Sequence, residues 1–102
     1  MRNFRTYQLS VRFYRSTEGL AVPGHLRDQL RRAASSVPLN LAEGYGKASV
    51  KEQRRYFETA LASLREVQAI LQLAEIQEHE AAHLADAVAA SLYKLLRAVK
   101  RR

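Results

Sequence analysis

The sequence predicts an all-α protein in which four helices form one antiparallel up-down-up-down bundle, with residues 1–102 as a single domain. Three observations favour this fold class. Four segments repeat apolar residues with the period of an α-helix. The chain has only four glycines and two prolines, too few for a β-rich fold with many tight turns. The breaks between the periodic segments are short, which favours antiparallel neighbours.

The first helix is expected over about residues 6–18. The inner face predicted by the helical period consists of Tyr7, Val11, Tyr14 and Thr17, with Phe13 alongside. Glycine and proline then interrupt the pattern at Gly19, Pro23 and Gly24. We therefore expect a short connection before the second helix.

The second helix is expected from about residue 25, with a periodic face formed by Leu26, Leu30, Ala33, Val37 and Leu41. Pro38 lies inside this pattern and removes one backbone donor, so we expect a kink there. The hydroxyls of Ser35 and Ser36 are placed to bond the freed carbonyls. Gly44 and Gly46 are expected to end the helix in a left-handed cap.

The third helix begins after Ser49, because Ser49 and Glu52 have the spacing of a capping box. Its inner stripe is predicted to be Phe57, Ala60, Leu61, Leu64, Val67, Leu71 and Ala74. The fourth helix is expected from about residue 78 to about residue 99, with Leu84, Val88, Leu92, Leu95 and Val99 facing inward.

Several apolar residues exceed what one small bundle needs. Ile70, Leu73 and Ile76 lie off the main stripe of the third helix, and Tyr56 and Tyr93 add aromatic area. Two interpretations stay open at this stage. These residues form part of an oligomer interface, or they belong to a wide core stripe with a few exposed apolar side chains.

The net charge of +7 and the absence of cysteine limit the kinds of function that the protein can have. A basic chain favours an anionic partner. Without cysteine there are no disulfides, thiolate zinc sites or cysteine nucleophiles. The amino-terminal residues lack the apolar core of a signal peptide, and no apolar run is long enough to span a bilayer. We therefore expect a soluble cytoplasmic protein.

Charge is segregated along the chain. Residues 1–55 hold 11 Lys/Arg and four Asp/Glu, residues 56–93 hold one Arg and six acids, and residues 94–102 hold five basic residues and no acid. Antiparallel threading would gather one set of helix ends into a basic pole. Its members are Arg2, Arg5, Lys47, Lys51, Arg54, Arg55, Lys94, Arg97, Lys100, Arg101 and Arg102, opposed by Glu43 and Glu52.

The other end would collect Glu18, Asp28, Glu75, Glu78 and Glu80, partly offset by Arg27. Helix dipoles explain some of this arrangement, but they disfavour lysines and arginines at the start of the third helix. Contact with a nucleic-acid backbone explains them, and a solvated basic end is the alternative. The candidate contact residues are Lys47, Lys51, Arg54, Arg55, Arg97 and Arg101.

No residue pattern indicates an enzyme, and we expect no catalytic, metal or cofactor site. His79 and His83 are four residues apart, a spacing that allows one metal to bind both, but a solvated helix start is the simpler interpretation. Ser35 and Ser36 lack a nucleophile elbow. Asn40 and Glu43 are expected to cap helix ends or to bond across the bundle, and a role in a partner site is the alternative.

The segment from residue 29 to residue 49 resembles a known family signature. It contains Gln29-Leu30-Arg31-Arg32-Ala33, then Ser36-Val37-Pro38, then Asn40-Leu41-Ala42-Glu43-Gly44, with Lys47 and Ser49 after it. This pattern is similar to that of the bacterial 23S rRNA-intervening sequence protein family. The resemblance marks Pro38, Asn40, Glu43 and Gly44 as signature structural residues.

The resemblance implies a left-handed four-helix bundle that assembles as a homopentamer. It also implies relatedness to the accessory variability determinant of diversity-generating retroelements, which works with a reverse transcriptase and its template RNA. The predicted function is therefore a non-enzymatic homo-oligomer whose basic pole binds nucleic acid, with RNA or a ribonucleoprotein as the expected partner. The alternative is an adaptor that binds another protein, such as a reverse transcriptase, without touching RNA or DNA.

Overall fold

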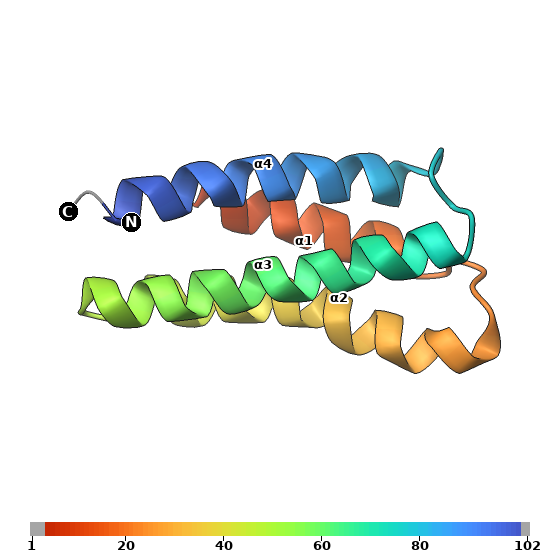
Figure 1. Cartoon of the computed structure of the whole chain (residues 1–102), viewed down its shortest axis with the longest axis horizontal. Helices are drawn as coiled ribbons and strands as arrows, with labels where there is room; N and C mark the ends of the chain where they lie inside the picture. Colours follow the sequence, from red (N-terminus) through yellow and green to blue (C-terminus); the bar gives the residue numbers. More distant parts are fainter. Residues whose placement is uncertain (1–3, 101–102) are drawn as a thin grey trace.

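The computed structural model describes residues 4–100, which form four helices joined by short connections (Figure 1). All four predicted helices are confirmed. They are α1 (Arg5–Thr17), α2 (Gly24–Tyr45), α3 (Val50–Leu73) and α4 (Glu80–Lys100). Within the described range, none of the helices is long and apolar enough to cross a membrane.

The helices surround one core in a molecule of 42 × 21 × 18 Å. Successive helices pack against one another, and α4 also packs against α1. The start of α1, the α2–α3 connection and the end of α4 lie at one end, and the other two connections lie at the opposite end (Figure 1). Across α3 and α4, Arg65 bonds Tyr93 and Gln68 bonds Asp86, so the partners run in opposite order along the two helices.

The core is built from the predicted stripes of α2, α3 and α4. All five predicted residues of the α2 face are buried, and Phe57, Leu64 and Val67 of α3 are at most 1% exposed. Leu61, Ala74 and Leu84 are only half-buried. Ile70 was expected outside the main stripe, and that expectation is wrong because it belongs to the core. Ile76 is half-buried against the core, and Leu73 is 72% exposed.

The buried face of α1 matches the prediction at Phe13 and Thr17 and differs from it elsewhere. It consists of Thr6, Ser10, Phe13 and Thr17, whereas Tyr7, Val11 and Tyr14 are half-buried. Three hydroxyl side chains can lie in this interface because each one is hydrogen-bonded. Their partners are Ser91 for Thr6, the Tyr7 carbonyl for Ser10 and the Tyr14 carbonyl for Thr17. A periodicity argument based on apolar residues missed Thr6 and Ser10.

Helix α2 continues through Pro38 as one element, and the predicted kink stays a prediction. The expected partners of the neighbouring serines are wrong, because neither hydroxyl bonds the carbonyl of Ala34, which is the one that Pro38 leaves free. Ser35 donates to the Arg32 carbonyl at 3.2 Å, and Ser36 instead bonds Ser63 of α3 at 2.7 Å. Asn40 donates to both the carbonyl and the hydroxyl oxygen of Ser36, each at 2.8 Å. Asn40 therefore supports a polar contact that joins α2 to α3.

The start of α3 shows one of the two bonds of the predicted capping box, and the Glu52 carboxylate accepts from the Ser49 hydroxyl in place of the second. The Ser49 hydroxyl accepts the Glu52 backbone N–H at 3.1 Å, which satisfies one of the donors that a helix start leaves unpaired. The Ser49 carbonyl accepts the Gln53 N–H at 3.0 Å and opens the helical ladder. These bonds fix the point at which the connection becomes helix.

The predicted left-handed cap at Gly44 and Gly46 is wrong. Gly44 is a buried residue inside α2, and Gly46 is right-handed, with φ −83°. Among the described residues, left-handed conformations follow two helices, at Gly19 with φ 78° after α1 and at Glu75 with φ 58° after α3. The end of α3 shows a complete capping motif. There the Ile76 N–H reaches the Leu71 carbonyl at 2.8 Å and the Glu75 N–H reaches the Gln72 carbonyl at 3.1 Å, which is a Schellman motif.

A Glu75→Gly substitution is expected to stabilise the protein by about 0.5–1 kcal/mol. A side chain with a Cβ is strained in the left-handed region, whereas glycine adopts it readily, and the extra freedom of glycine in the unfolded chain offsets part of the gain. Urea unfolding measures the change. Glu75→Ala is the control, because it removes the carboxylate and keeps the Cβ. Equal stabilisation by both variants would contradict the backbone explanation.

Candidate nucleic-acid interface

The end of the molecule at which α1 begins and α4 ends carries the basic pole. The start of α1, the end of α2, the start of α3 and the end of α4 meet there (Figure 1). Seven side chains of the pole are described: Arg5, Lys47, Lys51, Arg54, Arg55, Lys94 and Arg97. Arg2, Arg101 and Arg102 lie outside the described residues, so the Arg101 prediction has no structural counterpart. For Lys100 the structure describes only its position as the last residue of α4.

The α2–α3 connection holds Lys47 next to the first turn of α3. The Lys47 backbone N–H bonds the Gly44 carbonyl at 3.1 Å, and the Gln53 side chain donates to the Lys47 carbonyl at 3.1 Å. These two bonds tie the connection to the helices before and after it. The Lys47 backbone is therefore fixed just before the start of α3, which carries Lys51, Arg54 and Arg55.

Tyr56 organises two cations of the pole. The Lys47 ammonium lies 5.2 Å from the centroid of the Tyr56 ring, and the Arg55 guanidinium carbon lies 5.3 Å from it. Both distances are typical of cation–π contacts. An aromatic ring orients a cation without neutralising its charge, so both groups keep a full positive charge for a ligand. The sequence interpretation missed this role and assigned Tyr56 to surplus aromatic area.

Carboxylates near the pole neutralise little of its charge. Lys47 and Glu43 form an ion pair at 3.8 Å, and the Glu43 side chain is 61% exposed. An exposed pair of this kind contributes little energy and separates readily. Lys51, Arg54, Arg55, Lys94 and Arg97 form no ion pair with a carboxylate of residues 4–100. All five are exposed except Arg54, which is half-buried.

Below the charged surface, the pole has an aromatic base. Phe4, Tyr45 and Phe57 form a chain of edge-to-face contacts with centroid distances of 5.5 Å and 5.2 Å. Burial raises the pKa of Tyr45 above its usual 10.0, and the neighbouring Thr6 hydroxyl offsets part of that shift. The Tyr45 hydroxyl has no partner of good hydrogen-bond geometry within residues 4–100. Tyr45 thus stays uncharged beneath the pole.

Gly44 lets α2 approach α3 closely at this base. A Cβ built on Gly44 would lie 2.5 Å from Cε1 and 2.8 Å from Cδ1 of Phe57. Of the four signature residues, Gly44 therefore serves helix packing, Asn40 supports the Ser36–Ser63 contact, and Glu43 pairs with Lys47. Pro38 lies half-buried within α2. The role visible for these residues is structural.

The histidines do not form a metal site with other described residues. No group of three or more histidine, aspartate or glutamate side chains in residues 4–100 is placed to hold a metal ion. His79 has a different role, because its Nδ1 accepts the Ala81 backbone N–H at 2.9 Å near the start of α4. This bond satisfies a backbone donor at the helix start.

Comparison with family models gives one match over nearly the whole chain. Residues 4–101 match the model described as 23S rRNA-intervening sequence protein. Comparison with curated proteins gives no match.

Proposed function

We propose that this chain, which belongs to the 23S rRNA-intervening sequence protein family, is a non-enzymatic cytoplasmic protein that binds RNA through its basic pole. The observation that carries the proposal is the set of five described cations at one end of the bundle without an ion-paired carboxylate: Lys51, Arg54, Arg55, Lys94 and Arg97. A polyanion is the partner that such a surface suits best.

The placement of these charges supports a polyanionic ligand. Lys51 lies in the first turn of α3, where the helix dipole disfavours a cation by roughly 0.3–1 kcal/mol. Arg54 and Arg55 follow in the next turn, and their charges repel one another. Apart from the contact of Arg55 with the Tyr56 ring, folding gains little from this cluster, whereas binding to phosphates releases condensed counterions and gains free energy. The proposed contact residues are Lys47, Lys51, Arg54, Arg55, Arg97 and Arg101.

The antiparallel up-down-up-down topology and its left-handed supercoil are part of the proposal. The opposite order of the bonded pairs between α3 and α4 supports the topology. The place of the connections in Figure 1 also supports it. The proposed function depends on this arrangement, because only antiparallel threading gathers the four positively charged helix ends.

The proposal includes assembly into a homo-oligomer, with the pentamer implied by the family resemblance as the expected state. Two large apolar side chains on the surface support it, because Leu39 is 64% exposed and Leu73 is 72% exposed. Aligned protomers would bring several basic poles onto one face and increase the attraction for RNA. Light scattering measures the mass. A monomer at micromolar concentration would contradict this part of the proposal.

A salt titration against generic RNA tests the proposed function. We expect binding at low ionic strength that weakens steeply as salt rises, because log K falls by roughly 0.7 for each phosphate neutralised on a single strand per unit of log salt. Fluorescence anisotropy with a labelled RNA of mixed sequence measures the affinity. The absence of binding even at low salt would contradict RNA binding and would favour a solvated basic end.

A further inference from the structure

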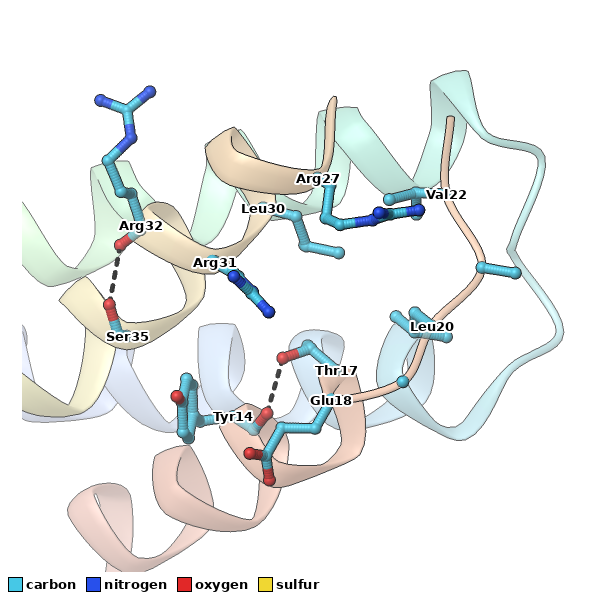
Figure 2. Close-up of a pocket in the computed structure, with 12 residues that line it drawn as sticks. Tyr14, Thr17, Glu18, Leu20, Val22, Arg27, Leu30, Arg31, Arg32 and Ser35 are labelled. Carbon is cyan, nitrogen blue, oxygen red and sulfur yellow. Dashed lines mark hydrogen bonds between the residues drawn. The ribbon is translucent and has the colours of Figure 1, made fainter. Parts of the chain in front are cut away.

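A groove of about 850 Å³ lies between α1 and α2 at the end opposite the basic pole (Figure 2). The last turn of α1, the connection and the first three turns of α2 form its walls. Its volume is within the range of small-molecule sites, about 300–1,000 Å³. Leu20 and Leu30 contribute apolar surface, and the Tyr14 ring lies at one edge.

Two arginines give the groove a positive charge. Arg27 and Arg31 both line it and are separated by one turn of α2, so their side chains project from the same face. Figure 2 shows Arg31 directed from α2 toward α1, whereas Arg32 points away from the groove. Neither Arg27 nor Arg31 forms an ion pair with a carboxylate of the described residues, although Glu18 lines the same groove. Their guanidinium groups are therefore available to an anion.

The hydroxyl oxygens of Thr17 and Ser35 can accept hydrogen bonds from a ligand in the groove, because both hydroxyl protons are already donated to carbonyls. Thr17 donates its proton to the Tyr14 carbonyl at 2.6 Å, and Ser35 donates its proton to the Arg32 carbonyl at 3.2 Å (Figure 2). Each hydroxyl oxygen still has lone pairs for a donor. The groove thus offers donors for an anion, acceptors for N–H or O–H groups, and an aromatic edge. A bare inorganic anion would use only the first of these.

We propose that this groove binds a nucleoside monophosphate, with the phosphate on Arg27 and Arg31. Guanidinium groups form paired, charge-assisted bonds with phosphate oxygens. The Tyr14 ring offers a stacking surface for the base, and the Thr17 and Ser35 oxygens accept from ribose or base donors. The nucleotide is either free in solution or the phosphorylated terminal nucleotide of an RNA. This inference goes beyond the proposed function, because it concerns the opposite end of the molecule.

Isothermal titration of the full chain with GMP, AMP, CMP and UMP tests the inference. At least one of these nucleotides should bind with one site per chain. The corresponding nucleoside and inorganic phosphate should each bind with an affinity at least about tenfold lower. The double variant Arg27→Gln/Arg31→Gln should weaken nucleotide binding by about tenfold or more. Both arginines are exposed, so the variant should keep its helical circular dichroism.

The matched control is Arg12→Gln/Arg15→Gln. It removes the same charge from exposed positions on α1 that do not line the groove. The control should bind the nucleotide as the wild type does. Equal loss in both double variants would show a general charge effect and overturn the site. No binding of any of the four nucleotides at low salt would also overturn it.

Two further experiments complete the test. The first distinguishes a free nucleotide from the terminal nucleotide of an RNA, and the second distinguishes this site from the basic pole. Competition by a 5′-phosphorylated RNA, but not by the same RNA with a 5′-hydroxyl, assigns the site to RNA ends. Competition by neither RNA assigns it to free nucleotides. The variant Arg54→Glu/Arg55→Glu should keep nucleotide binding. If it loses the nucleotide instead, the phosphate binds at the pole, and this inference fails while the proposed function stands.

Discussion

The double substitution Arg54→Glu/Arg55→Glu is expected to abolish RNA binding while the protein stays folded. It converts two charges that attract RNA, at the start of α3, into two that repel it. Neither arginine forms an ion pair with a carboxylate of the described residues. Each lost phosphate contact lowers the affinity, and each new carboxylate repels the backbone. We expect a loss of about a hundredfold or more at low salt.

The fold should tolerate this change. Arg55 is exposed and Arg54 is half-buried, and Thr59 bonds the Arg55 backbone carbonyl, which the substitution keeps. Acidic residues near a helix start suit the dipole, although new repulsion from Glu52 and Glu58 removes a few tenths of a kcal/mol, so we expect stability within about 1 kcal/mol of wild type. Anisotropy and urea unfolding measure the two effects.

The control for this experiment is Arg12→Glu/Arg15→Glu on α1, which makes the same change in net charge away from the pole. It should reduce RNA affinity only modestly, through the overall field of the molecule. An unchanged affinity of the Arg54→Glu/Arg55→Glu protein would exclude these arginines as the contact surface. Equal losses in both variants would show that net charge alone controls binding.

Gly44→Ala is expected to destabilise the protein by about 2–3 kcal/mol, because the added methyl group overlaps the Phe57 ring. The new Cβ would lie 2.5 Å from Cε1, and Phe57 is only 1% exposed and packed against Tyr45. The ring has no free space into which it can move, so α2 and α3 must separate. This cost outweighs the helix propensity that alanine adds, about 1 kcal/mol. Urea unfolding followed by circular dichroism measures the change.

Gly24→Ala is the matched control, because a Cβ at that position in α2 would meet no atom of the described residues within 4 Å, apart from its chain neighbours and the backbone of its own helix. It should be neutral or slightly stabilising. A double-mutant cycle tests the contact between residues 44 and 57. Gly44→Ala should lower the stability less in a Phe57→Leu protein, where the ring is absent. A Gly44→Ala protein as stable as wild type would disprove the close-approach explanation.

The sequence predicts the helices well because their boundaries depend on local chemistry. Ser49 and Glu52 place the start of α3, and the apolar period of α2 identifies its buried face. The predicted face of α1 was right at Thr17 and wrong at Thr6 and Ser10, which are buried through hydrogen bonds to Ser91 and to the Tyr7 carbonyl. Hydropathy does not register such bonds, so these two polar residues were left off the inner face.

The left-handed cap was wrong for a related reason. Glycine is common in that conformation but is also used for close helix packing, and the sequence alone does not distinguish the two uses at Gly44. The packing use depends on Phe57, which lies on another helix. Conversely, Glu75 adopts the left-handed conformation although its residue type gives no signal for it.

The candidate interface was predictable in outline, because helix ends that share one end of a bundle bring their charges together. The contacts between side chains within the interface were not predictable from the sequence. The approach of Lys47 and Arg55 to Tyr56 depends on side-chain directions around the α2–α3 connection. The groove with Arg27 and Arg31 depends on how α1 and α2 separate at the opposite end. That end was expected to be mainly acidic, and it also contains this basic groove.

The most direct test of RNA binding at the basic pole is ultraviolet crosslinking of a generic RNA to the full chain, with the modified peptides identified by mass spectrometry. We predict crosslinks in peptides that contain Lys47, Tyr56 and Arg97, with the Tyr56 ring as the strongest acceptor. Crosslinks confined to the opposite end, around residues 75–86, with none between residues 47 and 56, would contradict the proposed function.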